Sequence, residues 1–323
     1  MRAVVCRALG PLDQLVIEDR PAPAAGEGQV VVAVRAAGVN YVDGLLCQGR
    51  YQITPPTPFV PGGELAGVVA SVGSGVHDVA VGARVLAFTG LGAFAEHVAV
   101  PSGSVVPIPA QLSFAQAAAV VQSYSTALFA LTRRTSLRPG EWVLVLGAGG
   151  GVGLAAVDVS VALGARVIAA ASSEDKRAAA VAVGAEAAIA YEDDDLKRRA
   201  RQLSGGGVDV VVDPVGGRHS EAALRALGPF GRHLVIGFAG GAIPAVPLNH
   251  VLLNNRTVVG VDWGAWAMGH PQDNRLMLDE LLAMVADGRL HPPPPAECPL
   301  EHAAAVMAGL IERRIAGKVV LVP

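Results

Sequence analysis

The stretch VLVLGAGGGVG at residues 143–153 decides the fold. Its first half is a short apolar run typical of a buried strand, and its second half is a glycine-rich turn. The next residues, GLAAVDVSVALGA at 153–165, have the length and composition of a helix. A glycine-rich turn that leaves a strand and opens a helix is the setting of a dinucleotide site.

The glycines of this turn have separate predicted roles. A strict G-x-G-x-x-G does not fit the frame that ends at Gly153, and the pattern present is Ala148-x-Gly150-x-x-Gly153. Ala148 makes the tight turn, Gly150 lets the backbone approach a pyrophosphate, and Gly153 permits close packing of helix on strand. The helix N-terminus, including Gly151 and Val152, offers N–H groups and a positive dipole end to the phosphates. We predict dinucleotide binding here, the alternative being a flexible loop.

The second strand, RVIAAASS at residues 166–173, bears on the choice of nucleotide. NAD sites place Asp or Glu at the end of this strand, whereas this chain has Ser172 and Ser173. Ser172 is a predicted N-cap with Asp175 in the capping-box position, and Lys176 follows in the first helical turn. Hydroxyls, a cation and a helix N-terminus suit a 2′-phosphate, so we predict NADPH. The alternative is a solvated Lys176, although the chain has only three lysines.

Strands and helices alternate regularly over residues 119–263, which predicts βαβ units and a doubly wound parallel sheet. Residues 1–118 consist of short β-branched runs separated by Gly and Pro, which predicts a compact, barrel-like β-rich domain. The tail, residues 264–323, holds two helical stretches and a final strand and is assigned to the first domain. The α/β nucleotide-binding domain would then be an insertion. The acidic run at 192–195 is expected to be a solvated loop.

Composition excludes several classes of protein. The chain has 323 residues, of which 52% are apolar and 16% charged, and its formal net charge is −3. That length suggests two domains, and that charge argues against nucleic-acid partners and against binding to anionic membranes. Three cysteines far apart in the sequence exclude a disulfide scaffold and a Cys-x-x-Cys zinc module. We expect a soluble protein of a reducing compartment, the cytoplasm.

One segment, residues 114–131, is uncharged and about long enough to cross a membrane. It carries Gln122, Ser123 and Thr126 near its middle, so we predict a buried helix instead. The N-terminal stretch reaches Pro11 and Asp13 before an apolar core of signal-peptide length can build, so no signal peptide is expected.

Six further stretches carry a resemblance to a known family: AAGVNYVDGLLCQGRY (36–51), PGGELAGV (61–68), GAFAE (92–96), YSTA (124–127), DPVGG (213–217) and GKVVL (317–321). Together with the glycine turn they resemble the medium-chain dehydrogenase/reductase superfamily, and within it the zinc-free quinone oxidoreductase branch related to zeta-crystallin. The resemblance runs nearly end to end. It implies a Rossmann domain inserted into a GroES-like barrel domain, and a homodimer paired through edge strands.

The residues at the metal positions of this superfamily differ in this chain. Metal-binding relatives carry Cys where this chain has Asn40 and His where it has Gly63. Glu64 is kept, but a lone carboxylate is not a zinc site. The resemblance therefore implies no metal. Without a Lewis acid to ionise an alcohol, reduction of an electrophilic acceptor is expected.

The resemblance also assigns catalytic positions. It places Asn40 beside the nicotinamide, where its amide would hold the cofactor or polarise a carbonyl. Tyr51 either gives a hydrogen bond or proton to the acceptor oxygen or packs a loop. Asp43 either acts as an acid or orients the loop. Some relatives carry a second tyrosine at the position of Leu45. This chain lacks that tyrosine and so departs from the pattern that a two-tyrosine mechanism needs.

Four more residues fall at positions that line the cofactor cleft in the family: Thr126, Tyr191, Phe238 and Lys318. Phe238 would equally serve as a core aromatic, and Tyr191 could close the end of a strand. The predicted activity is NADPH-dependent, zinc-independent reduction of quinones or other α,β-unsaturated carbonyls by hydride transfer. The alternatives are an enoyl-thioester reductase, which would need a basic phosphate-binding entrance, and a non-catalytic NADPH-binding structural or sensor protein.

Overall fold

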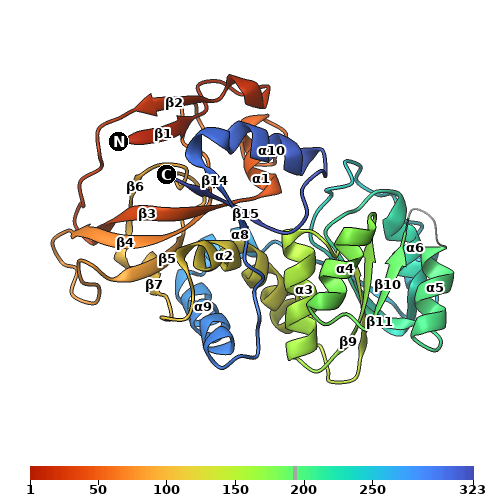
Figure 1. The fold of residues 1–323 in the computed structure, drawn as a ribbon. Coiled ribbons are helices and arrows are strands. Elements are labelled where there is room, and N and C mark those ends of the chain that lie inside the picture. Colours follow the sequence, from red (N-terminus) through yellow and green to blue (C-terminus); the bar gives the residue numbers. More distant parts are fainter. Residues whose placement is uncertain (192–194) are drawn as a thin grey trace. The chain divides into compact units, whose positions relative to one another are not determined.

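The computed structural model describes residues 1–191 and 195–323. Most of the acidic run expected as a loop lies outside these residues. The described chain forms two compact units. Unit 1 consists of Met1–Gln122, Ala267–Ala286 and Pro293–Pro323, and unit 2 of Ser123–Trp266 and Asp287–Pro292. Each unit has an apolar core of its own. Each is built on a separate main sheet (Figure 1).

Unit 2 is built on a parallel sheet of six strands in the order β10-β9-β8-β11-β12-β13. Counted from its first strand the order is 3-2-1-4-5-6, as in Rossmann domains, which confirms the predicted doubly wound sheet. The direction of winding reverses between β8 and β11, where ligands of such sheets bind at the carboxyl ends. The strands are β8 (Trp142–Leu146), β9 (Arg166–Ala171), β10 (Ala187–Ala190), β11 (Val208–Asp213), β12 (Leu227–Val235) and β13 (Thr257–Gly260).

Helices cover this sheet and bury its apolar strands. Helix α3 contacts β8, β9 and α4, while α6 contacts β11, β12 and α5 (Figure 1). Leu144, Ile168 and Val211 are fully buried in the resulting core. The helices are α3 (Gly151–Ala162), α4 (Glu174–Ala182), α5 (Leu196–Leu203), α6 (Arg218–Ala226) and α7 (Asn249–Leu252).

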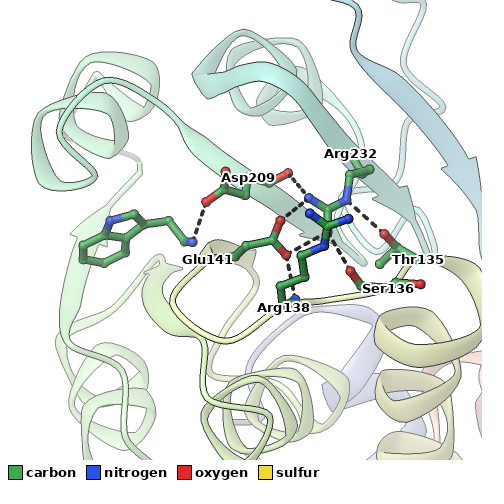
Figure 2. Close-up of polar contacts among 7 residues, drawn as sticks. Thr135, Ser136, Arg138, Glu141, Asp209 and Arg232 are labelled. Atoms are coloured by element: carbon green, nitrogen blue, oxygen red, sulfur yellow. Dashed lines mark hydrogen bonds and ion pairs between the residues drawn. The ribbon is translucent and has the colours of Figure 1, made fainter.

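A polar network ties the amino ends of these strands together (Figure 2). Arg232 of β12 makes a two-pronged ion pair with Glu141, with nitrogen–oxygen distances of 2.8 and 2.9 Å. Glu141 also accepts from the backbone N–H of Arg138 at 2.8 Å, and Nε of Arg232 donates to Thr135 at 2.9 Å. Each side chain of the ion pair is 18% exposed. This network lies at the end of β8 opposite the glycine turn.

Unit 1 contains a seven-stranded sheet, mostly antiparallel, with β6 paired to β3 beside the path β14-β15-β3-β4-β5-β7. The C-terminal β15 pairs with β3, so two segments far apart in the sequence lie side by side (Figure 1). This confirms the predicted β-rich, GroES-like domain. The strands of this sheet are β3 (Gln29–Val39), β4 (Glu64–Val72), β5 (Arg84–Phe88), β6 (His97–Pro101), β7 (Val105–Pro107), β14 (Ala296–Pro299) and β15 (Val319–Val322). Strands β1 (Arg2–Val5) and β2 (Val16–Asp19) pair with each other in a separate two-stranded sheet.

Three helices accompany the sheet of unit 1: α1 (Tyr41–Cys47), α9 (Pro271–Ala286) and α10 (Ala303–Ile311). The strand-like texture of residues 1–118 does not predict α1, because its seven residues are too few to show a helical period. Two further helices continue from one unit into the other, α2 (Phe114–Leu128), followed by a π-helical turn (Phe129–Arg134), and α8 (Trp263–Gly269). The stretch Phe114–Arg134 passes a membrane-span test by length and composition, but 83% of its most apolar window is buried.

Residues 287–292 correct the predicted domain division, which assigns them to the first domain. The backbone N–H of His291 donates to Oδ2 of Asp158 on α3 at 2.8 Å, and Leu290 is buried. The hydroxyl of Tyr124 donates to the same oxygen at 2.8 Å. Burial raises the pKa of Asp158 despite these bonds. Because the contact is made by the backbone N–H of His291, it could not be predicted from the side chains of residues 287–292.

Candidate functional site

The glycine turn of unit 2 leaves β8 and enters α3 as predicted. Gly147 has a φ of +59°, a conformation that favours glycine, and Gly150 is the N-cap of α3. A Cβ on Gly153 would lie 2.2 Å from the carbonyl oxygen of Gly147. Only glycine at position 153 therefore lets the helix pack on the turn, while Ala148 is fully buried beneath it.

Gly150 differs from Gly153 in having room. A Cβ on Gly150 would meet only the carbonyl oxygen of Gly147, at an ordinary 3.5 Å, and its φ of −92° is open to any residue. Nothing in unit 2 therefore requires glycine at this position. Gly151 and Val152 follow at the first turn of α3, where N–H groups lack partners within the helix. An open surface beside such a helix N-terminus fits the phosphates of a dinucleotide.

Lys176 lies against this turn. A Cβ on Gly149 would stand 2.4 Å from Cβ of Lys176, so the lysine stem packs directly over the glycine backbone. The helix that carries it begins one residue later than predicted. Its N-cap is Ser173, and Asp175 is therefore not in the capping-box position. Strand β9 runs on to Ala171, which leaves the exposed Ser172 as the connecting residue.

The turn that follows β11 contacts the glycine turn that follows β8. These two strands are neighbours at the point where the winding of the sheet reverses. A Cβ on Gly147 would lie 2.8 Å from Val215. Asp213 holds this second turn, because its Oδ1 accepts the backbone N–H groups of Val215 and Gly216 at 2.9 and 2.8 Å. Its Oδ2 accepts from Ser220 and His233. Burial alone would raise the pKa of Asp213, but the bonds from His233, Ser220 and Gly216 hold it below its ordinary value.

Two predicted cofactor residues flank these turns. The ring of Phe238 packs on Gly216, where a Cβ would lie 2.7 Å from it. Tyr191 follows β10, and its ring centroid lies 4.4 Å from that of His219. Thr126 lies on α2 and is 8% exposed. Phe238 and Tyr191 are half-buried, so both keep part of their surface available to a ligand.

Unit 1 brings four residues considered in the sequence into one buried cluster: Asn40, Asp43, Glu64 and Lys318. Asn40 is the N-cap of α1, and its Nδ2 donates to Oε1 of Glu64 at 2.8 Å. Nζ of Lys318 donates to Oδ1 of Asn40 and lies 2.6 Å from Oε1 of Glu64. The amide thus uses one of its two N–H groups within unit 1.

Glu64 is the centre of this cluster. Its side chain has no exposed surface, and its Oε2 accepts the backbone N–H of Gln122 at 2.5 Å. Gly38, its register partner on β3, makes room for it, because a Cβ there would lie 2.1 Å from Oε1. A buried carboxylate of this kind requires a cation, and Lys318 is that cation.

Asp43 caps the N-terminus of α1. Its Oδ2 accepts the backbone N–H of Asn40 at 2.7 Å, which orients the start of the helix. Its Oδ1 is buried and has no hydrogen-bond partner. Burial raises the pKa of Asp43 to about 7, although the Asn40 N–H and the Lys318 charge both oppose the shift. Tyr51 is half-buried in a bend that follows α1, and its role stays a prediction.

Comparison with known proteins agrees with both units. An alcohol dehydrogenase GroES-like domain model matches residues 26–110, and a zinc-binding dehydrogenase model matches residues 151–283. The quinone oxidoreductase-like protein 2 homolog of Nematostella vectensis is 38% identical over 99% of this chain and 88% of its own length. The chain belongs to the zinc-free quinone oxidoreductase branch of the medium-chain dehydrogenase/reductase superfamily.

Solved structures of quinone oxidoreductases share the whole fold. The enzyme of Pseudomonas syringae pv. tomato DC3000 is 33% identical, with a TM-score of 0.92 over 100% of this chain and 99% of its own. That of Thermus thermophilus, solved also with NADPH, is 36% identical, with a TM-score of 0.86 over 100% of both chains. Within residues 1–191 and 195–323 of this quinone oxidoreductase relative, no group of three or more His, Cys, Asp or Glu side chains could hold a metal ion.

Two residues of these sites could not be recognised from the sequence of this quinone oxidoreductase relative. Sequence reasoning discards Glu64 because a lone carboxylate cannot bind zinc, yet Glu64 organises the Asn40 cluster. The available signal is a carboxylate within an otherwise apolar strand, ELAGVVASV at residues 64–72. Gly149 is missed because its role depends on Lys176, which approaches from another helix.

Proposed function

We propose that this chain is an NADPH-dependent, zinc-independent reductase of quinones or other α,β-unsaturated carbonyls. The observation that carries the proposal is Lys176 packed over the glycine turn, with Ser172 and Ser173 in place of an acid at the end of β9. A lysine and two hydroxyls favour a 2′-phosphate over a 2′-hydroxyl. Solved relatives in complex with NADPH support the same choice.

NADPH supplies the hydride when bound, and the protein supplies binding and orientation. The amide of Asn40 has one N–H beyond the one that it donates to Glu64. We assign that N–H to the carbonyl oxygen of the acceptor or to the nicotinamide carboxamide. A fixed donor aimed at an oxygen that gains negative charge lowers the barrier more than it strengthens ground-state binding.

The direct test follows NADPH oxidation over a panel of quinones, enones and enoyl thioesters, with and without exhaustive chelation. Turnover of quinones or enones that survives chelation is expected. A clear preference for enoyl thioesters would move the function to the alternative reductase. NADPH binding without turnover of any acceptor would favour a structural or sensor role.

The phosphate site has its own test, because the glycines of the turn separate packing from ligand approach. Gly150→Ala should fold normally, since a methyl group there has room within the chain. It should lose at least about tenfold in NADPH affinity, because the methyl group would block the approach of a pyrophosphate to the backbone. Gly103→Ala is the matched control, at another open glycine with an ordinary φ. Equal NADPH affinity of Gly150→Ala and wild type by calorimetry would move the phosphates elsewhere.

We also propose a homodimer paired through β13, the edge strand of the parallel sheet. An unpaired edge is a template for another strand, and contiguous exposed apolar side chains mark contact surfaces. Exposed apolar side chains occur on β13 and in the sequence that leads to it from β12: Phe230, Ile243, Leu248, Leu252, Leu253 and Val258. Val258→Lys should yield monomers by light scattering, whereas Val181→Lys, at a similarly exposed valine of α4, should not.

A further inference from the structure

The Asn40 amide is held from both sides by groups of opposite charge. Its Nδ2 donates to the Glu64 carboxylate at 2.8 Å, while the Lys318 ammonium donates to its Oδ1. A half-turn of the amide would set its carbonyl oxygen against the carboxylate and its NH₂ against the ammonium. The two charged groups therefore select one of the two orientations of the amide.

Glu64 has little freedom of its own. It is fully buried, and its two oxygens are bonded to Asn40, Lys318 and the backbone of Gln122. Gly38 behind it provides space for the carboxylate. A carboxylate fixed by a backbone N–H on one oxygen presents the other oxygen to Asn40 at a constant place. Hydrogen bonds to charged groups are roughly twice as strong as neutral ones, so the amide is held firmly.

We infer that Glu64, with Lys318 as its counter-charge, is a positioning residue for the Asn40 amide. The pair keeps the remaining N–H of that amide aimed in one direction. Glu64 has no exposed surface, so it acts through Asn40 and need not touch an acceptor. The inference rests on the proposed function, because it names what orients the group assigned there to the nicotinamide or the acceptor.

Glu64→Gln tests the inference with little change of shape. A glutamine amide can satisfy Asn40 in either orientation, so one of the two selecting charges is removed, and Lys318 alone remains, while packing is kept. We expect kcat to fall about 10- to 100-fold, with KM for NADPH and NADPH affinity changed less than about threefold. Glu141→Gln is the matched control, since it removes an ion-paired carboxylate of unit 2 (Figure 2). Its kcat should stay within about twofold of wild type.

A spectroscopic reading separates positioning from general loss of structure. The side-chain amide signals of Asn40, identified by their absence in Asn40→Asp, should exchange with water at least about tenfold faster in Glu64→Gln. Glu64→Asp, which keeps the charge but withdraws the carboxylate from Asn40 by one methylene, should act in the same direction and is the second variant if Glu64→Gln fails to fold. Unchanged kcat and unchanged amide exchange in a folded variant would overturn the inference. If the wild type reduces no acceptor, the proposed function fails, and amide exchange alone decides the positioning.

Discussion

Two ion pairs of low solvent exposure, one in each unit, differ in how completely they are bonded. In unit 2 both oxygens of Glu141 and all three nitrogens of the Arg232 guanidinium have partners within 3.4 Å (Figure 2). In unit 1 the Glu64–Lys318 pair is joined to an Asn40 amide with spare capacity and lies near Asp43, whose Oδ1 has no partner. A saturated network can only stabilise the fold, whereas an unsaturated one can also bind a ligand.

Arg232→Met should have the largest effect, and on stability alone. Removing the guanidinium leaves Glu141 as an uncompensated, largely buried carboxylate, so the free energy of unfolding should fall by about 3–5 kcal/mol. Denaturant titration of the variant and the wild type measures the fall. Activity per folded molecule should not change. A loss of kcat in the folded variant would contradict a purely structural role for this network.

Asp43 should make the protein less stable as pH rises, whereas a fully hydrogen-bonded carboxylate such as Glu141 makes it less stable as pH falls. Its pKa in the folded protein is about 7, above the ordinary 3.8, so the unfolded chain ionises first as pH rises. From about pH 4 to pH 7 the wild type should therefore lose up to about 4 kcal/mol of stability relative to Asp43→Asn, and no more above that range. Unfolding titrations of both proteins across this range measure the difference.

Glu141 is the counterpart in the same experiment. Burial raises its pKa, but the bonds from Arg232 and Arg138 outweigh burial and leave the pKa below 4.5. Its contribution is present above the unfolded pKa and is lost as pH falls through the folded one. The advantage of wild type over Glu141→Gln should thus shrink in acid. Parallel curves for the Asp43 and Glu141 variants would remove the distinction between the two regions.

Tyr51 tests whether a second residue of unit 1 contributes to catalysis by contacting the acceptor. If its hydroxyl meets the acceptor oxygen, Tyr51→Phe should lower kcat and kcat/KM together by roughly 10- to 1,000-fold and leave NADPH affinity unchanged. The assay needs an enone as well as a quinone, because some quinones accept electrons without protonation in the slow step. Wild-type rates on both would return Tyr51 to a packing role.

Lys176→Ala should give the smallest effect, confined to cofactor choice. The wild type should bind NADPH more tightly than NADH by about 1–3 kcal/mol, and the variant should lose most of that difference. Calorimetry with both cofactors measures it. Equal affinities in the wild type would leave Lys176 as a side chain that only packs on Gly149.

Local sequence patterns predict unit 2 well, because each βαβ step is written in consecutive residues. The strand–turn–helix at 143–153 and the close packing at Gly153 follow from spacing alone. The cluster of unit 1 could not be derived in this way. Resemblance supplies Asn40 and Lys318, but the bonds that join them to Glu64 depend on the pairing of β3 with β4 and β15. Such pairings have no local signature.

The pairing of β15 with β3 also sets an order of events during synthesis. Lys318 follows Asn40 by 278 residues, which at 5–20 residues per second corresponds to about 14–56 s of translation. Until then Glu64 has no ammonium beside it, and enclosing it would leave a bare carboxylate in an apolar sheet. Unit 1 should therefore stay open on the ribosome while the inserted parallel sheet folds, and its cluster should close only when the last strand arrives.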